Sequence, residues 1–268
     1  MQIRVFDFSG VYREQEYSFP EGTEFLDLRG IEGTSCYCDD AAARLINKYL
    51  ATRCQDTAGV RGGLGECLTQ YGPIVSGINF VDSGDYHYVT ALHCAVLHER
   101  FNLLLLDNHP DMQEPAFGNI LSCGGWVRKM LQENKNLNKV LIAGIDPALA
   151  AETEGFPRRV TVLTREEKDL HDKIKTWLDS LQEPLYISID KDVLARGYAS
   201  TDWEQGTMTL DTLKEILVNI GNWHRASGGR VLGIDICGEL PSNKCGGQED
   251  FALNNRTNLI LLSLCENL

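Results

Sequence analysis

The chain has 268 residues, of which 43% are hydrophobic and 24% are charged, and its formal net charge at pH 7 is -13. An acidic surface repels phosphate backbones and anionic headgroups, so we expect neither a nucleic-acid partner nor a membrane partner. The longest apolar runs are too short to span a bilayer, and the first residues lack a signal-peptide pattern. The 9 cysteines are scattered and odd in number, which favours reduced thiols and a cytoplasmic location.

Short apolar runs that end in an acid or a turn recur along the chain. They cover residues 3–8, 74–85, 101–111, 139–146, 184–192 and 230–237. Segments such as LLLL and LYISI show no polar alternation, which is typical of strands buried on both faces of a parallel sheet.

Amphipathic segments between these runs predict helices. They cover residues 41–54, 88–98, 124–137, 165–182, 209–228 and 254–267. Asp39 and Asp40 are suitable caps for the first of these helices. The alternation predicts one three-layer α/β/α domain over residues 1–268, with a mostly parallel, doubly wound sheet. We interpret the glycine-rich stretch 55–72 as a loop within that domain.

The most informative motif is Asp107-Asn108-His109-Pro110-Asp111, which directly follows LLLL. Side chains at positions i, i+2 and i+4 of an extended chain point the same way. We therefore expect Asp107, His109 and Asp111 to converge where the strand ends, at the edge where open parallel sheets bind ligands. Asp190 and Asp192 repeat the pattern after LYISI, and His87 adds an imidazole where another run passes into a helix.

These four carboxylates and two imidazoles form a candidate site for two divalent cations. Oxygen and nitrogen donors without thiolate suit Mn²⁺, Mg²⁺, Fe²⁺, Co²⁺ or Zn²⁺. Four crowded negative charges would repel one another unless cations compensate them. By contrast, we interpret Asp82 and Asp146 as caps of turns or helices. The remaining histidines read as ordinary core or surface residues: His93, His98, His171 and His224.

The order and spacing of the motifs resemble the ureohydrolase superfamily, which includes arginase, agmatinase and formiminoglutamase. GDYHY at 84–88, DNHPD at 107–111 and SIDKD at 188–192 stand where that superfamily has GGDHS-, DAHxD- and SxDxDxxDP-type motifs. The resemblance covers most of the chain. It implies an arginase-like fold, two divalent metal ions that are usually Mn²⁺, a small-molecule substrate and, as in many relatives, a homo-oligomer.

Carried over residue by residue, the resemblance implies two overlapping sets of ligands. One ion would be held by His87, Asp107, Asp111 and Asp190, and the other by His109, Asp107, Asp190 and Asp192. A hydroxide bridging the two ions would attack the trigonal carbon of a guanidino, amidino or formimino group. Asp111 would pass the proton of that hydroxide to the leaving amine, and Glu239 in GIDICGEL would pair with a cationic group of the substrate.

The sequence also departs from the superfamily pattern, and these departures leave the substrate open. The usual Asp-Pro downstream of Asp192 is missing, and Glu239 lies one residue further from Asp235 than is usual. The segment 118–125 replaces a GNxHG-type motif and contains no histidine. Two alternatives therefore remain: a deacetylase-like amidohydrolase that uses the same metals, and a metal-binding relative that has lost turnover.

Two loops supply the candidate substrate-contacting residues Asn119, Ser122, Cys123 and Cys36. Residues 118–125 precede a helix whose free N–H groups would suit an anion, and Cys123 is a candidate proton relay; the alternative is a simple turn. Cys36 and Cys38 lie in a loop before another helix. Their position before a helix favours two buried thiols in an N-terminal turn over a reactive group. CxC also lacks the CxxC spacing that is typical of structural zinc sites. We interpret Trp126 and Trp203 as core or interface residues.

Overall fold

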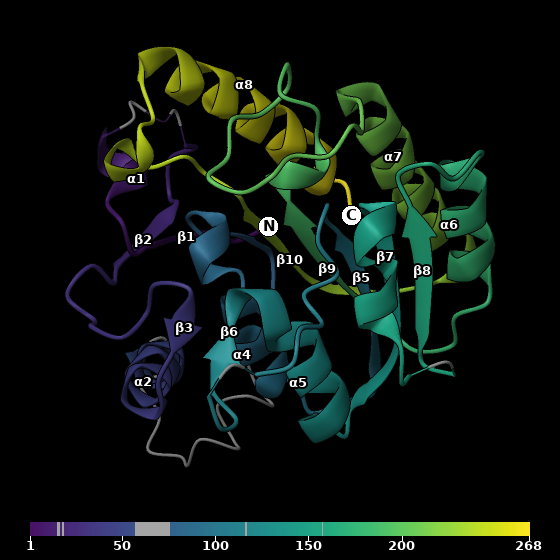
Figure 1. Ribbon diagram of the computed structural model, residues 1–268, viewed down its shortest axis with the longest axis horizontal. Helices are drawn as coiled ribbons and strands as arrows, with labels where there is room; N and C mark the ends of the chain where they lie inside the picture. Colours follow the sequence, from purple (N-terminus) through teal and green to yellow (C-terminus); the bar gives the residue numbers. More distant parts are fainter. Residues whose placement is uncertain (15–16, 18, 57–75, 116, 157) are drawn as a thin grey trace.

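Eight strands form a parallel sheet through the middle of the protein (Figure 1). The computed structural model describes residues 1–14, 17, 19–56, 76–115, 117–156 and 158–268. The strand order is β2-β1-β4-β10-β9-β5-β7-β8. The strands are β1 (Ile3–Asp7), β2 (Glu24–Asp27), β4 (Ile78–Phe80), β5 (Phe101–Leu106), β7 (Leu137–Ile145), β8 (Val160–Thr164), β9 (Leu185–Asp190) and β10 (Val231–Cys237). Every residue of β5 and β9 is buried, as their unbroken apolar runs predict.

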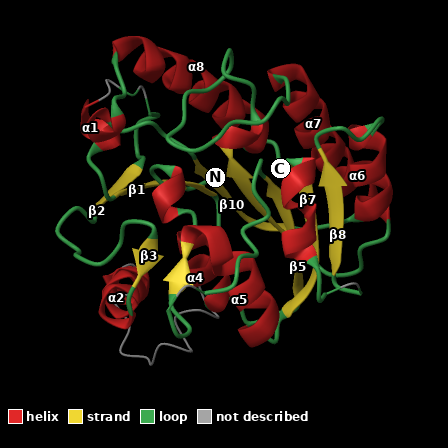
Figure 2. Cartoon of the chain, in the orientation of Figure 1, coloured by secondary structure: helices red, strands yellow, loops and turns green. Residues whose placement is uncertain are grey.

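Helices cover both faces of the sheet (Figure 2). The core on one face is closed by α6 (Leu170–Asp179), α7 (Leu210–Ser227) and α8 (Gln248–Cys265). The other face is closed by α2 (Asp40–Asp56), α4 (Val89–Ala95) and α5 (Trp126–Glu133), and a short α1 (Val11–Glu14) follows β1. The predicted three-layer, doubly wound α/β/α fold is therefore confirmed.

Local capping explains where several of these helices begin. Asp39 accepts hydrogen bonds of 2.8 Å from the backbone N–H groups of Ala41 and Ala42, which makes it the N-cap of α2, as its sequence position predicts. Thr209 caps α7 in the same way through Thr212. None of the described helices has the length and apolar character needed to cross a membrane.

Some strands were not expected from the sequence. β8 is a partly exposed edge strand that lacks a continuous apolar run. A second, antiparallel sheet joins β3 (Tyr37–Cys38) to β6 (Leu121–Ser122), so two loops far apart in the chain lie side by side. The stretch 55–72, expected to be a loop, lies outside the described residues except for the end of α2.

Strand register sets the position of the candidate site. β9 lies between β5 and β10, with Leu106 opposite Ile189 and Asp190 opposite Cys237. Because the three strands are parallel, their carboxyl ends meet at the same edge of the sheet. The residues that follow β5 and β9 are thus neighbours in space although more than 80 positions separate them along the chain.

Candidate metal centre

Imidazole and carboxylate groups gather at this edge in two triads whose donor atoms lie within 4.8 Å of one another. The first triad is His87, Asp107 and Asp111, and the second triad is Asp107, His109 and Asp192. Asp190 lies beside the first triad, with 3.5 Å between its Oδ2 and Nδ1 of His87. The structure therefore brings all six predicted ligands into one cluster.

Asp107 belongs to both triads and offers a different oxygen to each. Its Oδ2 is 3.3 Å from Nδ1 of His87, and its Oδ1 is 3.5 Å from Nδ1 of His109. The remaining contacts complete each triad: His87 Nδ1 is 3.0 Å from Asp111 Oδ2, and His109 Nδ1 is 2.8 Å from Asp192 Oδ2. A carboxylate oriented in this way is suited to bridge two cations.

Tight turns, rather than an extended chain, make these side chains converge. The backbone N–H of His109 donates to Asp107 Oδ1 at 2.6 Å, and that of Asp192 donates to Asp190 Oδ1 at 2.9 Å. Asp111 has a φ of 51°, in the left-handed region. The expected convergence is present, but its expected cause is wrong: each aspartate folds the chain back around its own carboxylate.

Neighbouring groups fix the orientation of the candidate ligands. Nε2 of His87 lies 2.8 Å from Oγ of Ser188, which leaves Nδ1 facing the carboxylates. The indole N–H of Trp126 donates to Asp111 Oδ2 at 2.5 Å. Hydrogen bonds of this kind orient metal ligands and strengthen binding, so the surroundings of the cluster resemble those of a metal site.

Without cations, burial and mutual interaction shift the pKa values of the groups in the cluster toward the protonated forms. Burial and the charge of Asp107 raise the pKa of Asp111 to about 7. Burial also raises the pKa of Asp192, again with the charge of Asp107. Burial opposes protonation of His109, but its hydrogen bonds with Asp107 and Asp192 outweigh that effect and raise its pKa to about 12. Buried carboxylates whose pKa is raised by a neighbouring carboxylate fit a site in which divalent cations supply positive charge.

A cavity of about 200 Å³ opens onto the cluster. Its wall includes the predicted residues Cys36, Ser122 and Cys123, which the β3–β6 pairing brings next to the candidate ligands. Asn119 does not line this cavity: it is exposed and donates to Glu133. The two loops proposed to touch a substrate thus meet at the cavity, while the amide of Asn119 is directed elsewhere.

Known proteins resemble this chain over the region that contains these motifs. The model of the arginase family matches residues 83–255, a span that contains every candidate ligand. The chain belongs to the arginase family. An uncharacterised protein of Thermotoga maritima is 28% identical over 244 residues, which cover 88% of this chain and 79% of that protein.

Solved structures of arginase-family proteins share the fold. The agmatine ureohydrolase of Thermoplasma volcanium aligns with a TM-score of 0.64 and 15% identity, over 99% of this chain and 89% of that one. The arginase of Bacillus cereus aligns with a TM-score of 0.64 and 12% identity, over 100% of this chain and 97% of that one. At such low identities, the likeness establishes the fold.

Glu239 occupies a different environment from the one expected for it in this arginase-family chain. It is buried and forms an ion pair with Nζ of Lys191. Its carboxylate also accepts a hydrogen bond of 2.7 Å from Asn258 and one of 2.5 Å from the hydroxyl of Tyr17. Glu239 is not part of the cavity wall, so its carboxylate is satisfied inside the protein rather than turned toward a substrate.

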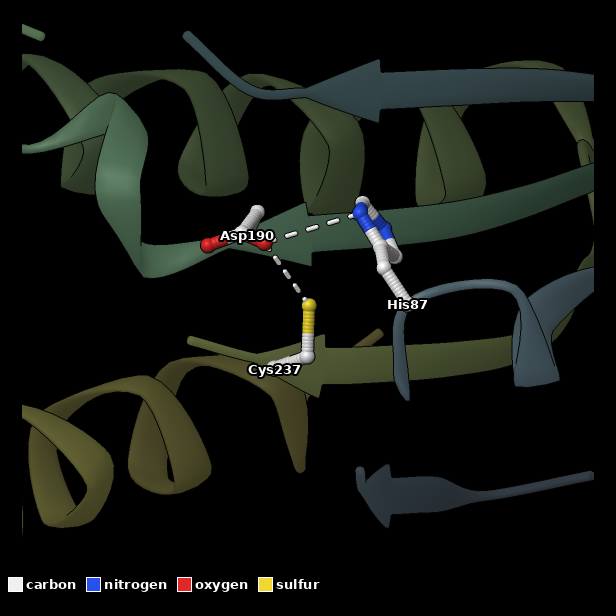
Figure 3. A group of neighbouring side chains, drawn as sticks. All are labelled: His87, Asp190 and Cys237. Carbon is white, nitrogen blue, oxygen red and sulfur yellow. Dashed lines mark hydrogen bonds and ion pairs between the residues drawn. The ribbon is translucent and has the colours of Figure 1, made fainter. Parts of the chain in front are cut away.

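Several residues around the cluster were not predicted from the sequence as part of the site. The sequence predicts core or interface positions for Trp126 and Trp203, but Trp126 donates a hydrogen bond to Asp111 and Trp203 lines the cavity. Glu152 also lines the cavity, and Cys237 lies within 4.8 Å of His87 and Asp190 (Figure 3). The position of Cys237 at the end of a predicted strand was the one available signal, since strand ends form the ligand-binding edge.

Proposed function

We propose that this arginase-family protein is a hydrolase that uses two divalent cations to cleave a C–N bond of a small guanidino, amidino or formimino compound. The observation that carries the proposal is the orientation of Asp107, which directs one oxygen toward each triad. One residue placed in this way links two ion positions. The oxygen and imidazole donors of the second triad suit Mn²⁺, the ion that the family resemblance implies.

The protein's own side chains would bind, orient and protect the reacting groups. When bound, the cations would supply an activated water and a positive charge that stabilises the developing anion. Asp111, held by Trp126, would accept a proton from the water and pass it to the leaving amine. Trp203, 6.0 Å from the ring of His109 by ring centroids, covers part of the cluster and limits access of bulk water.

We assign recognition of a substrate cation to Glu152 instead of Glu239. Glu152 lines the cavity, and its Oε2 is buried without a hydrogen-bond partner among the described residues. Burial raises its pKa, although the charges of His109 and Arg128 oppose the change. An unpaired carboxylate in a cavity wall is costly unless a cation or donor meets it, so Glu152 is the acid best placed to bind a guanidinium.

Replacing Asp190 tests the proposal. In Asp190→Ala we expect loss of metal from one or both positions and loss of hydrolysis, with the fold intact. The measurements are metal content and release of urea or ammonia from guanidino, amidino and formimino compounds. Asp146→Asn is the control, because Asp146 also follows a strand, but its side chain caps a turn through Ala148, pairs with Arg165 and belongs to neither triad. Full activity in metal-free Asp190→Ala protein would refute the proposal.

The missing histidine of segment 118–125 favours a second candidate, a metal-dependent amidohydrolase of the deacetylase type. His87 and His109 are the only imidazoles in the cavity wall as described, so no third histidine there can shuttle protons to a leaving amine. Product analysis separates the two reactions: acetate or another acid from an amide, against urea or ammonia from a guanidino compound. Bound metal with no hydrolysis of either class would instead indicate a non-catalytic relative.

A further inference from the structure

A buried thiol stands at the metal cluster, where the sequence predicted only oxygen and nitrogen donors. Cys237 is the last residue of β10 and lies opposite Asp190 in the parallel register. The whole residue is only 1% exposed. Its Sγ lies 3.1 Å from Asp190 Oδ2. Figure 3 shows Cys237 and Asp190 pointing toward each other from adjacent strands, with His87 approaching from a third segment.

The group of side chains that contains this sulfur overlaps with the first triad. His87, Asp190 and Cys237 form a group whose donor atoms lie within 4.8 Å of one another, and His87 also belongs to the first triad. An ion held by His87 and Asp190 would therefore have the sulfur within reach. The second triad has no thiol among its members, so the two ion positions differ in chemistry.

The backbone that follows Cys237 runs close to Asp190. Gly238, the next residue, has a φ of +89°, and a Cβ added there would lie 2.4 Å from Asp190 Oδ1. The chain end of β10 thus approaches Asp190 more closely than any side chain at position 238 would allow. A core thiol needs only apolar packing, as at Cys265, whereas Cys237 faces an imidazole and a carboxylate.

We propose that Cys237 is a direct ligand of the ion held by His87 and Asp190, and that this position prefers Zn²⁺, Co²⁺ or Fe²⁺ to Mn²⁺. The inference rests on the proposed metal centre but not on the reaction it performs. On binding, the S–H bond breaks, the sulfur donates its electron pair to the ion, and the proton passes to solvent. Thiolate is a soft donor, which favours these ions over Mn²⁺.

Cobalt substitution tests the inference directly. Metal-free protein loaded with Co²⁺ should show a near-ultraviolet thiolate-to-cobalt charge-transfer band. The band should vanish in Cys237→Ser, which keeps a hydrogen-bond donor near Asp190 but removes the sulfur. Cys265→Ala is the matched control, because it removes a buried thiol from the core on the other side of the molecule, and it should keep the band.

Competition between metals gives a second readout. In Cys237→Ser, the preference for Zn²⁺ over Mn²⁺ should fall by about tenfold or more, the scale on which ligand surroundings alter affinity. Circular dichroism and thermal unfolding check that the variant folds, and Cys237→Ala serves if the serine variant does not. Co²⁺ bound to wild-type protein without the charge-transfer band would overturn the inference and leave the thiol as a hydrogen-bond donor to Asp190.

The outcomes also separate this inference from the proposed function. A charge-transfer band in a protein that hydrolyses no guanidino, amidino or formimino compound would support the thiolate ligand and count against the reaction. Hydrolysis of such a compound without the band would support the reaction and count against the ligand.

Discussion

Among single side chains, Glu152 offers the sharpest test of the proposed recognition of a substrate cation, because it lines the cavity. Glu152→Gln keeps the size of the side chain but removes its charge. A hydrogen bond to a charged group is worth about 1.5–3 kcal/mol, so we expect KM for a cationic guanidino substrate to rise about 10- to 100-fold, with a smaller change in kcat. Steady-state kinetics on the most active compound of the panel would measure this.

The control for this prediction lies two positions along the same loop. Glu154 is exposed and does not line the cavity, so Glu154→Gln should leave KM unchanged. Equal KM values for wild type and Glu152→Gln would show that another group binds the substrate. A rise in KM for Glu239→Gln alone would restore the role that the family resemblance implied for that residue.

Among the elements, the end of β10 lies close to the turn after β9, and we expect this approach to position the candidate ligand Asp190. Gly238→Ala would place a methyl group 2.4 Å from Asp190 Oδ1 and 2.8 Å from the backbone nitrogen of Lys191. We expect the carboxylate to be displaced, with metal affinity falling about tenfold or more. The left-handed backbone would cost a further 1–2 kcal/mol, roughly, in the free energy of unfolding.

Gly118→Ala provides the comparison for the backbone cost alone. Gly118 also has a positive φ, of 55°, but a Cβ there would meet nothing within 4 Å. It should lose stability without losing metal affinity, as measured by urea unfolding and metal titration. Similar metal affinities for the two variants would mean that Gly238 does not position Asp190.

The elements also show what the sequence could and could not predict. Unbroken apolar runs predicted β5 and β9, and the acids after them predicted which side chains form the candidate ligand cluster, because both signals are local in the chain. The two-residue strands β3 and β6 carry no such signal and exist only through their pairing. The contacts of Cys237 and Trp126 could not be predicted either, because they depend on how separate elements pack.

For the molecule as a whole, the buried acids predict how stability depends on pH when metal is removed. Burial raises the pKa of Asp82, Asp111 and Asp202 from 3.8 to about 7. In the unfolded chain these groups lose their protons near pH 4, so the stability they contribute is present below that pH and is lost as pH rises through 7. The raised pKa of His109 also lowers the free energy of unfolding as pH rises above 6.5.

We therefore expect the metal-free protein to have a smaller free energy of unfolding at pH 8 than at pH 5. Divalent cations favour ionised carboxylates and neutral imidazole, so saturating metal should reduce or reverse this loss. Urea unfolding at both pH values, with and without metal, measures the difference. The same loss of stability with and without metal would show that cations do not compensate the cluster.

The proposed chemistry depends on two divalent cations that share Asp107, and calorimetric titration of the metal-free protein would count them. We predict two equivalents of Mn²⁺ or Zn²⁺ per chain for the wild type, with both sites weakened by Asp107→Ala because that residue serves both triads. A single equivalent in the wild type, or two equivalents that bind Asp107→Ala with unchanged affinity, would show that Asp107 does not serve two ion positions.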